Sequence, residues 1–336
     1  MKLSFIIVAF NSESLIDNSL TSLENQDYPH SEIEVILVDG LSTDNTKQKM
    51  LEFKSKAHDF GRIIVKDNPG KYLACGWNVA LKEATGEIIL RVDAHTKFPK
   101  DFIRKNIECI ENGEDICGGK VISILEDDSP YNRVLLESEN SMFGGGFTFF
   151  RRGNESKYTS TLAFAAYRKE VFDSVGPYNE NLVRTEDNDM HYRMKKNGYK
   201  FFFNPNIYSY RYCRSNFRAL MRQKFLNGYW VGLTMGISPR AFSIFYFAPL
   251  CFVLGLIASI AFCFVSPILL EVFLAAYTIV LIMSLIAAIK RNGFYPKILL
   301  LPFIIFALHL VYGIGTLKGL ISIPKWRKNI LSIKHK

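Results

Sequence analysis

The last third of the chain contains three long apolar segments, and no other feature limits the fold as strongly. Residues 242–265 carry no charged side chain, residues 268–289 carry only Glu271, near their start, and residues 298–320 carry only Lys318, near their end. A helix needs about 20 apolar residues to cross a bilayer. The sequence therefore predicts a membrane region at 242–321, preceded by a water-soluble domain at 1–214.

Basic residues gather beside these segments and contribute to a formal net charge of +9. This placement favours contact with the anionic cytoplasmic leaflet and argues against nucleic acid as a partner. Residues 215–241 mix basic and apolar side chains, as in a helix that lies in the membrane interface. We expect a multi-pass protein of the inner or plasma membrane with a cytoplasmic soluble domain. The basic residues are Arg211, Arg214, Arg218, Arg222, Lys224, Lys290, Arg291, Lys325, Arg327 and Lys328.

The basic tail at 322–336 conflicts with a simple three-span arrangement. Three complete crossings would place this tail outside, against the preference of basic residues for the cytoplasmic side. Breaks at Pro302, Gly313 and Gly315 would also permit a re-entrant or interfacial third segment. The sequence favours three membrane segments, at about 242–265, 268–289 and 298–320, and leaves the side of the tail open.

The soluble part alternates between buried strands and amphipathic helices. Apolar runs at 3–10, 33–38, 63–65 and 88–92 predict strands, and the stretches between them have helical spacing. This alternation is typical of an α/β domain with a mostly parallel sheet. No GxGxxG follows the first run, so a Rossmann dinucleotide site is not supported.

Polar residues stand where several of these strands end. Asn11 follows the first strand, Asp39 ends the second, and Asp93 and His95 follow the fourth. The carboxyl edge of an open α/β sheet is where ligands bind. Residues two apart in an extended chain point to the same side, and oxygen plus imidazole suits Mn²⁺ somewhat better than Mg²⁺. Asp93 and His95 therefore predict half of a metal site, and the alternative is a polar strand end without function.

Glu186 and Asp187 open a later predicted helix. Acids are common in a first helical turn because the helix dipole favours them. The functional interpretation is that one of them faces the cleft as a general base.

Two further features carry weaker predictions. Residues 143–150 are rich in glycine and phenylalanine, which suggests either a flap over the substrate or a surface loop. Six cysteines form no Cys-x-x-Cys pair, so reduced structural thiols are expected.

Taken together, these motifs resemble family 2 glycosyltransferases of the GT-A fold, over about residues 1–230. Five stretches carry the resemblance, in the family's order and spacing. The subgroup that it resembles is the membrane-anchored, succinoglycan-type transferases of bacterial exopolysaccharide biosynthesis. The stretches are the opening strand to Asn11, Val38-Asp39-Gly40-Leu41-Ser42-Thr43-Asp44, Gly76-Trp77-Asn78 with Ala84-Thr85-Gly86-Glu87, Asp93-Ala94-His95 in the place of Asp-x-Asp, and Thr185-Glu186-Asp187.

The resemblance implies a role for each site residue. Asn11, Asp39, Asn78 and Asp93 would contact the nucleotide sugar, and Asp44 would support the loop. Asp93 and His95 would hold Mn²⁺ or Mg²⁺. Asp187 would be the catalytic base, and Glu186 would steady it.

The family resemblance also implies the reaction, an inverting, metal-dependent sugar transfer from a nucleotide-diphosphate sugar to a lipid-linked saccharide. The Gln-x-x-Arg-Trp signature of processive synthases is missing around Trp230, so addition of a single sugar is preferred. Transfer to polyprenyl phosphate or to diacylglycerol is the enzymatic alternative. A membrane scaffold without activity is the alternative of another class.

Overall fold

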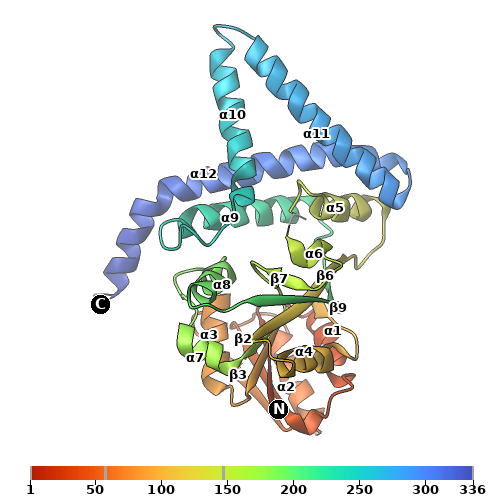
Figure 1. The fold of residues 1–336 in the computed structure, drawn as a ribbon, viewed down its shortest axis with the longest axis vertical. Helices are drawn as coiled ribbons and strands as arrows, with labels where there is room; N and C mark the ends of the chain where they lie inside the picture. Colours follow the sequence, from red (N-terminus) through yellow and green to blue (C-terminus); the bar gives the residue numbers. More distant parts are fainter. Residues whose placement is uncertain (1, 57–58, 146–147, 335–336) are drawn as a thin grey trace. The chain divides into compact units, whose positions relative to one another are not determined.

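The computed structural model describes residues 2–56, 59–145 and 148–334. The chain forms two compact units, which are coloured along the sequence in Figure 1. Unit 1 contains the described residues of Met1–Ile122 and Thr148–Tyr212, and unit 2 those of Ser123–Phe147 and Cys213–Lys336. The predicted domain at 1–214 therefore differs from unit 1 mainly because the segment 123–147 belongs to unit 2.

Unit 1 is built on a mixed sheet. Strands β1, β2, β3 and β4 are parallel, and β8 then pairs with β4 in the antiparallel direction. The described order is β3 (Arg62–Asp67), β2 (Ile33–Asp39), β1 (Leu3–Ala9), β4 (Ile88–Asp93), β8 (Ala166–Arg168), β6 (Ile116–Ile124), β9 (Phe201–Tyr212) and β5 (Thr96–Lys97), with β7 (Lys157–Thr159) on β9. The predicted parallel sheet is confirmed for its first four strands.

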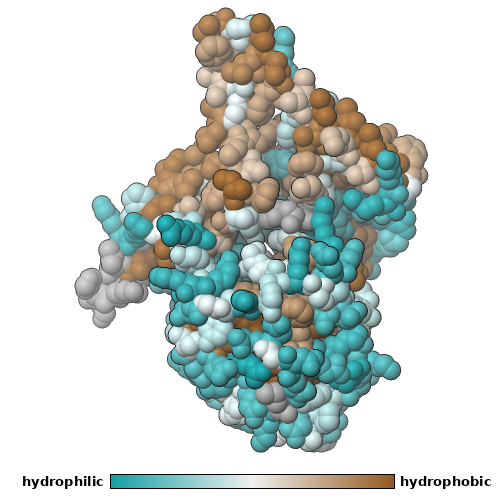
Figure 2. All heavy atoms as spheres, in the orientation of Figure 1, coloured by the Kyte–Doolittle hydropathy of each residue, from teal (hydrophilic) through white to brown (hydrophobic). Residues whose placement is uncertain are grey.

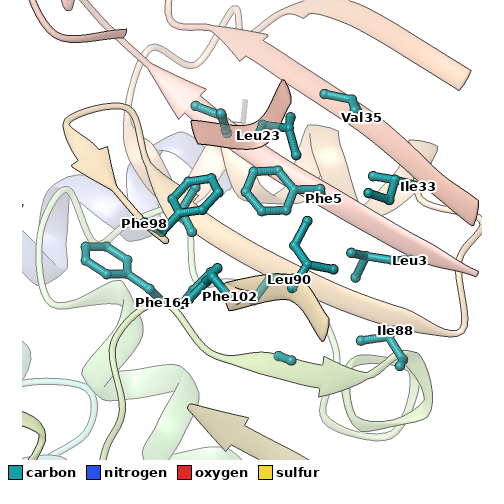
Figure 3. Close-up of a cluster of buried hydrophobic side chains, with 14 of the residues drawn as sticks. Leu3, Phe5, Leu23, Ile33, Val35, Ile88, Leu90, Phe98, Phe102 and Phe164 are labelled. Atoms are coloured by element: carbon teal, nitrogen blue, oxygen red, sulfur yellow. The ribbon is translucent and has the colours of Figure 1, made fainter. Parts of the chain in front are cut away.

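The parallel strands β1, β2 and β4 are mostly apolar because both faces of the sheet are covered. Alternate residues of β1 enter two different cores: Leu3, Phe5 and Ile7 face one, and Ile6 and Val8 face the other. Figure 3 shows the first core, where Phe5 lies beside Phe98, Leu90 and Leu3. The helices of unit 1 are α1 (Ile16–Glu24), α2 (Thr46–Lys56), α3 (Leu73–Glu83), α4 (Phe102–Glu111), α6 (Phe149–Arg152), α7 (Lys169–Val175) and α8 (Glu186–Lys196).

The predicted aromatic loop is partly helical. Phe149 and Phe150 begin α6, whereas residues 146–147 lie outside the described part of the chain.

The expectation that every cysteine is reduced is wrong for two of them. Cys109 and Cys117 form a disulfide, with their Cα atoms 6.3 Å apart. Cys109 lies in the last turn of α4 and Cys117 in β6, and the chain reverses between them through Gly113, whose φ is +103°. A positive φ of this kind favours glycine.

Unit 2 contains the apolar helices. Within the described residues, three helical stretches are long and apolar enough to cross a membrane: Ile244–Phe262, Ile268–Asn292 and Pro296–Ile330. Figure 2 shows hydrophobic residues covering α10 and α11. The helices are α5 (Pro130–Asn140), α9 (Phe217–Thr234), α10 (Ala248–Phe262), α11 (Ile268–Asn292) and α12 (Leu301–Lys334), with short 3-10 turns at Ile244–Phe247 and Pro296–Leu300. Helix α12 runs through Gly313 and Gly315 without a break.

Glycines allow α9 and α12 to approach each other closely. A Cβ at Gly232 would collide with the carbonyl oxygen of Thr316 and lie 2.9 Å from Cα of Gly319, and a Cβ at Gly319 would collide with the carbonyl of Tyr229. The four-residue spacing, Gly228 to Gly232 and Gly315 to Gly319, is the small-residue pattern of closely packed helices. Sequence analysis overlooked this signal.

We expect Gly232→Leu to destabilise unit 2 by about 1–3 kcal/mol, because the side chain forces the two backbones apart. The measurement is the thermal unfolding temperature of the detergent-solubilised protein. Ala258→Leu is the matched control, since Ala258 lies on an exposed face of α10. Equal unfolding temperatures for the two variants would contradict close packing at Gly232.

Candidate active site

The register of the parallel strands brings two predicted site residues to one edge. Asp39 is opposite Ala9, and Asp93 is opposite Val8, so both lie where β2, β1 and β4 end. Strands are about 4.8 Å apart, so β2 and β4 are separated by roughly 10 Å across β1. This edge therefore carries Asp39 and Asp93 on either side of the exit of β1.

Asn11 and Asp39 connect the loops that leave β1 and β2. Asn11 has φ +47°, and its side-chain oxygen accepts a hydrogen bond from the backbone N–H of Thr43 at 2.8 Å. The backbone N–H of Ser42 donates to Asp39 Oδ2 at 3.0 Å. Asp39 is 1% exposed, and within the described residues its Oδ1 has no hydrogen-bond partner. A buried acceptor without a donor is costly, so this oxygen is suited to a donor on a ligand.

Asp44 holds the same loop from within. Its Oδ1 accepts from the backbone N–H of Thr46 at 3.0 Å, and its Oδ2 accepts from the N–H of Glu13 at 3.1 Å. Burial opposes ionisation of Asp44, but the hydrogen bonds from Thr46 and Glu13 outweigh it, so its pKa is lowered. Both oxygens are used inside the protein, which agrees with a supporting position.

Asp93 and His95 lie on the same side of the chain after β4. Asp93 Oδ2 is 4.0 Å from His95 Nε2, and the side chains are 35% and 37% exposed. Ser19, on α1, fixes the turn that carries them, because its hydroxyl donates to the carbonyl of Thr96 at 2.6 Å and accepts from the N–H of Thr96 at 3.2 Å. Among the described residues, no group of three or more His, Cys, Asp or Glu side chains is placed to hold a metal ion. The pair offers one carboxylate and one imidazole, a donor set that fits a divalent cation such as Mn²⁺.

The two predicted acids begin α8. Thr185 precedes them in the left-handed region at φ +65°, and Glu186 is 4% exposed. Burial raises the pKa of Glu186, and the charge of Asp187 raises it further. Burial also raises the pKa of Asp187, with Arg91 opposing and Asp93 adding to the effect. Asp93 thus lies within electrostatic reach of both acids.

Arg91 is the positive charge behind these acids, and sequence analysis gave it no role. It lies in β4, 8% exposed, with its guanidinium 5.1 Å from the ring centre of Trp77 and 5.4 Å from that of Tyr178. Burial acts against its charge, but Tyr178, Tyr167, Asp187 and Glu186 favour it, so its pKa is raised. The sequence feature that could have pointed to Arg91 is a charged residue inside an otherwise apolar strand.

A buried hydrogen-bond chain lies next to Arg91. His191 Nδ1 is 2.8 Å from Thr161 Oγ1, and its Nε2 is 3.0 Å from Tyr167 Oη. Burial lowers the pKa of His191 well below its ordinary value, and the charges of Arg91 and Lys195 act in the same direction. His191 is therefore a neutral link between Thr161 and Tyr167, and it holds Tyr167 beside Arg91.

Asn78 holds the other aromatic neighbour of Arg91. Its amide nitrogen donates to the carbonyl of Tyr178 at 2.9 Å and to Glu180 Oε1 at 2.8 Å, and its oxygen accepts from the N–H of Tyr178 at 2.8 Å. These bonds use both amide hydrogens. The predicted nucleotide contact of Asn78 stays a prediction, while its observed contacts position Tyr178.

The chain matches a family model. The model described as "Glycosyl transferase family 2" covers residues 4–176.

Two curated relatives extend this similarity. One, from Methanococcus voltae, is dolichyl N-acetyl-alpha-D-glucosaminyl phosphate 3-beta-D-2,3-diacetamido-2,3-dideoxy-beta-D-glucuronosyltransferase. It is 27% identical over 327 residues, which cover 95% of this chain and 97% of the relative. The succinoglycan biosynthesis protein ExoA of Rhizobium meliloti is 27% identical over 225 residues, 66% of each chain.

Two solved structures share the fold. The mannosyltransferase PcManGT of Pyrobaculum calidifontis, in complex with GDP-Man and Mn²⁺, has a TM-score of 0.55 at 21% identity and covers 96% of this chain and 86% of its own. S. aureus TarS 1–349 has a TM-score of 0.51 at 20% identity and covers 97% and 92%. The predicted GT-A fold is thereby confirmed.

Proposed function

The chain belongs to glycosyltransferase family 2, and from that premise we propose that it transfers one sugar, with inversion, from a nucleotide-diphosphate sugar to a lipid-linked saccharide. The proposal is supported by two kinds of group that lie within electrostatic reach of each other. The candidate metal ligands Asp93 and His95 follow β4, and the buried acids Glu186 and Asp187 lie within electrostatic reach of Asp93.

We assign the donor side to the ends of β1, β2 and β4. The unpartnered Oδ1 of Asp39 would accept from the base or ribose, and the loop held by Asn11 and Asp44 would frame the nucleotide. Asp93 and His95 would hold Mn²⁺ or Mg²⁺ next to the diphosphate. A divalent cation there would neutralise negative charge on the leaving diphosphate. In support, PcManGT has been solved with GDP-Man and Mn²⁺.

We assign the acceptor side to Asp187. Its carboxylate would take the proton from the attacking hydroxyl while the new bond from that oxygen to the sugar carbon forms and the bond from carbon to diphosphate oxygen breaks. A single direct displacement inverts the configuration at that carbon. Glu186 would keep the pair from carrying two full charges, because burial and its neighbour both disfavour ionisation.

The name of one relative supports a lipid-linked acceptor, and the name of another supports a role in polysaccharide biosynthesis. The Methanococcus voltae relative is named for a dolichyl phosphate sugar, and ExoA for succinoglycan biosynthesis. The three candidate membrane spans would keep the enzyme at the lipid surface, with unit 1 on the cytoplasmic side of the plasma membrane. Transfer to polyprenyl phosphate or diacylglycerol remains the second candidate.

The full-length protein in detergent tests the function directly. Nucleotide sugars are screened by thermal shift with and without Mn²⁺, and the stabilising donor is radiolabelled and added to a lipid extract. A labelled saccharide released from lipid by mild acid supports the proposal. Labelled polyprenyl phosphate or diacylglycerol supports the alternative, and no transfer with any donor contradicts both.

Metal dependence provides a separate prediction. We expect EDTA to abolish transfer and Mn²⁺ to restore it, and His95→Ala to raise the Mn²⁺ concentration needed for half-maximal activity at least tenfold. His95→Asp should restore activity and change the preference between Mn²⁺ and Mg²⁺, because a carboxylate replaces an imidazole. The control variant is His30→Ala, which removes a different imidazole of unit 1. Undiminished turnover after exhaustive chelation would refute the metal assignment.

A further inference from the structure

Helices α9 and α12 lie side by side and run in the same direction within unit 2. Successive glycines of α9 contact successive turns of α12, in ascending order along both helices. Beyond the end of α9, the carbonyl oxygen of Gly236 accepts a hydrogen bond from Nε of Arg327 at 3.0 Å. A Cβ at Gly228 would meet Tyr312 and one at Gly232 would meet Thr316; past the end of α9, one at Gly236 would meet Ile323.

Helices α10 and α11 form a hairpin in the same unit. A short turn near Ser266 joins the end of α10 to the start of α11, and the rings of Phe252 and Phe273 stack between the helices with their centres 5.8 Å apart. Figure 1 shows this hairpin standing away from the α9–α12 pair. Beyond Val253 the hairpin exposes large apolar side chains: Leu254, Ile257, Ile260, Phe262, Phe264, Val265, Ile268, Leu269, Val272 and Leu274. At 1.5 Å per residue, the 19-residue stretch Ile244–Phe262, which includes α10, is about 29 Å long and the 25-residue α11 about 38 Å, so both are long enough for the roughly 30 Å hydrocarbon core of a bilayer.

The parallel direction of α9 and α12 restricts how the chain can cross a membrane. A hairpin that crosses and returns brings the start of α12 back to the side where α9 ended. If α9 crossed, α12 would then have to cross in the opposite direction, and the pair would be antiparallel. Because the pair is parallel and closely packed, neither helix crosses when the hairpin does.

The charged helix α5, which packs against the start of α12, agrees with this conclusion. Its first turns share an apolar cluster with Val134 and Leu135 of α5, a helix with exposed charges. Glu139 of α5 pairs with Lys224 of α9 at 3.0 Å, and Glu137 pairs with Arg291 at 2.8 Å. Charged helices of this kind are strongly disfavoured in hydrocarbon.

We propose that α10 and α11 are the membrane crossings of the described chain, and that the α9–α12 pair lies flat on the anionic leaflet of the side that carries unit 1. The occupant of this surface is a layer of acidic lipid headgroups, which matches the charge of the pair. Exposed apolar side chains such as Phe303, Ile314 and Ile321 would enter the acyl boundary. The exposed basic residues are Arg218, Arg222, Lys318, Lys325, Arg327 and Lys328.

This arrangement removes the conflict over the tail. The basic groups before α10, after α11 and on α12 all lie on one side. The turn on the far side, residues 263–267, contains no Lys or Arg. The preference of basic residues for the cytoplasmic side is then satisfied.

Cysteine labelling of the full chain in intact spheroplasts tests the sides. Cys75, Cys213, Cys251 and Cys263 are replaced by serine, and single cysteines are introduced as Lys54→Cys in unit 1, Val265→Cys in the turn and Lys328→Cys in the tail. We expect a membrane-impermeant maleimide to label the Val265 variant in intact cells, and the other two only after permeabilisation. Labelling of the Lys328 variant in intact cells, or the same behaviour at all three positions, overturns the proposal.

Depth measurements in proteoliposomes test the flat placement. An environment-sensitive dye is attached through Ile314→Cys in the middle of α12, or through Ile257→Cys in the middle of α10. We expect nitroxide lipids labelled near the headgroup to quench the dye at position 314 most strongly, and lipids labelled at the chain end to quench it at position 257. If the two positions are quenched at the same depth, α12 crosses and the proposal is wrong. Neither experiment depends on the sugar-transfer reaction.

Discussion

Replacing Asp187 by asparagine should lower kcat by about 10²–10⁴-fold, because the variant keeps the shape of the side chain but cannot take a proton from the acceptor hydroxyl. KM for the donor should change little, since the nucleotide is assigned to the other side of the edge. The measurement is steady-state transfer with purified protein. Asp173→Asn, on the exposed side of α7, is the matched control and should leave kcat unchanged.

The pH dependence of kcat/KM should reflect the burial of Asp187. Burial raises its pKa, and the general base must be deprotonated to act. We therefore expect the acidic limb of kcat/KM to lie at higher pH than for an exposed aspartate. An Asp187→Asn variant with wild-type turnover and an unchanged acidic limb would show that another group is the base.

Replacing Arg91 by methionine should have the second large effect, on both stability and pH dependence. Arg91 is buried within electrostatic reach of Glu186 and Asp187, and its removal takes away the positive charge that favours their ionised forms. The loss of this compensating charge should cost about 1–3 kcal/mol, the usual range for removal of a buried interaction. Because a positive charge favours the ionised carboxylate, its loss raises the pKa of Asp187 and moves the acidic limb of kcat/KM further towards high pH.

The two readouts distinguish this role of Arg91 from simple packing. Thermal unfolding reports the stability loss, and the pH profile of the residual activity reports the electrostatic change. Arg104→Met is the control, since Arg104 is 42% exposed in its pairs with Asp27 and Glu108. A less stable Arg91 variant with an unchanged pH profile would mean that Arg91 only fills space between Trp77 and Tyr178.

Much of unit 1 could be predicted from local patterns. Continuous apolar runs mark the strands from Leu3, Ile33 and Ile88 because both faces of a parallel sheet are buried. Polar residues directly after those runs, such as Asp39 and Asp93, then had to share the carboxyl edge. The disulfide between Cys109 and Cys117 was not predictable, because the spacing of two cysteines does not tell how the chain turns between them.

Contacts between residues that are far apart in the sequence show most clearly what the structure adds to the sequence. The sequence does not reveal that the amide of Asn78 is bonded to Tyr178 and Glu180. It also does not reveal that Arg91 lies within electrostatic reach of the candidate base. Such roles depend on which helix packs over which strand.

Local patterns were enough to predict the apolar helices, the parallel strands and the polar residues at the strand ends, because burial and periodicity are properties of neighbouring residues. Only long-range packing places Asp93 and Arg91 within electrostatic reach of Asp187 and makes α9 and α12 run in the same direction. These features arise from long-range packing, whose geometry is not encoded in the spacing of residues along the chain.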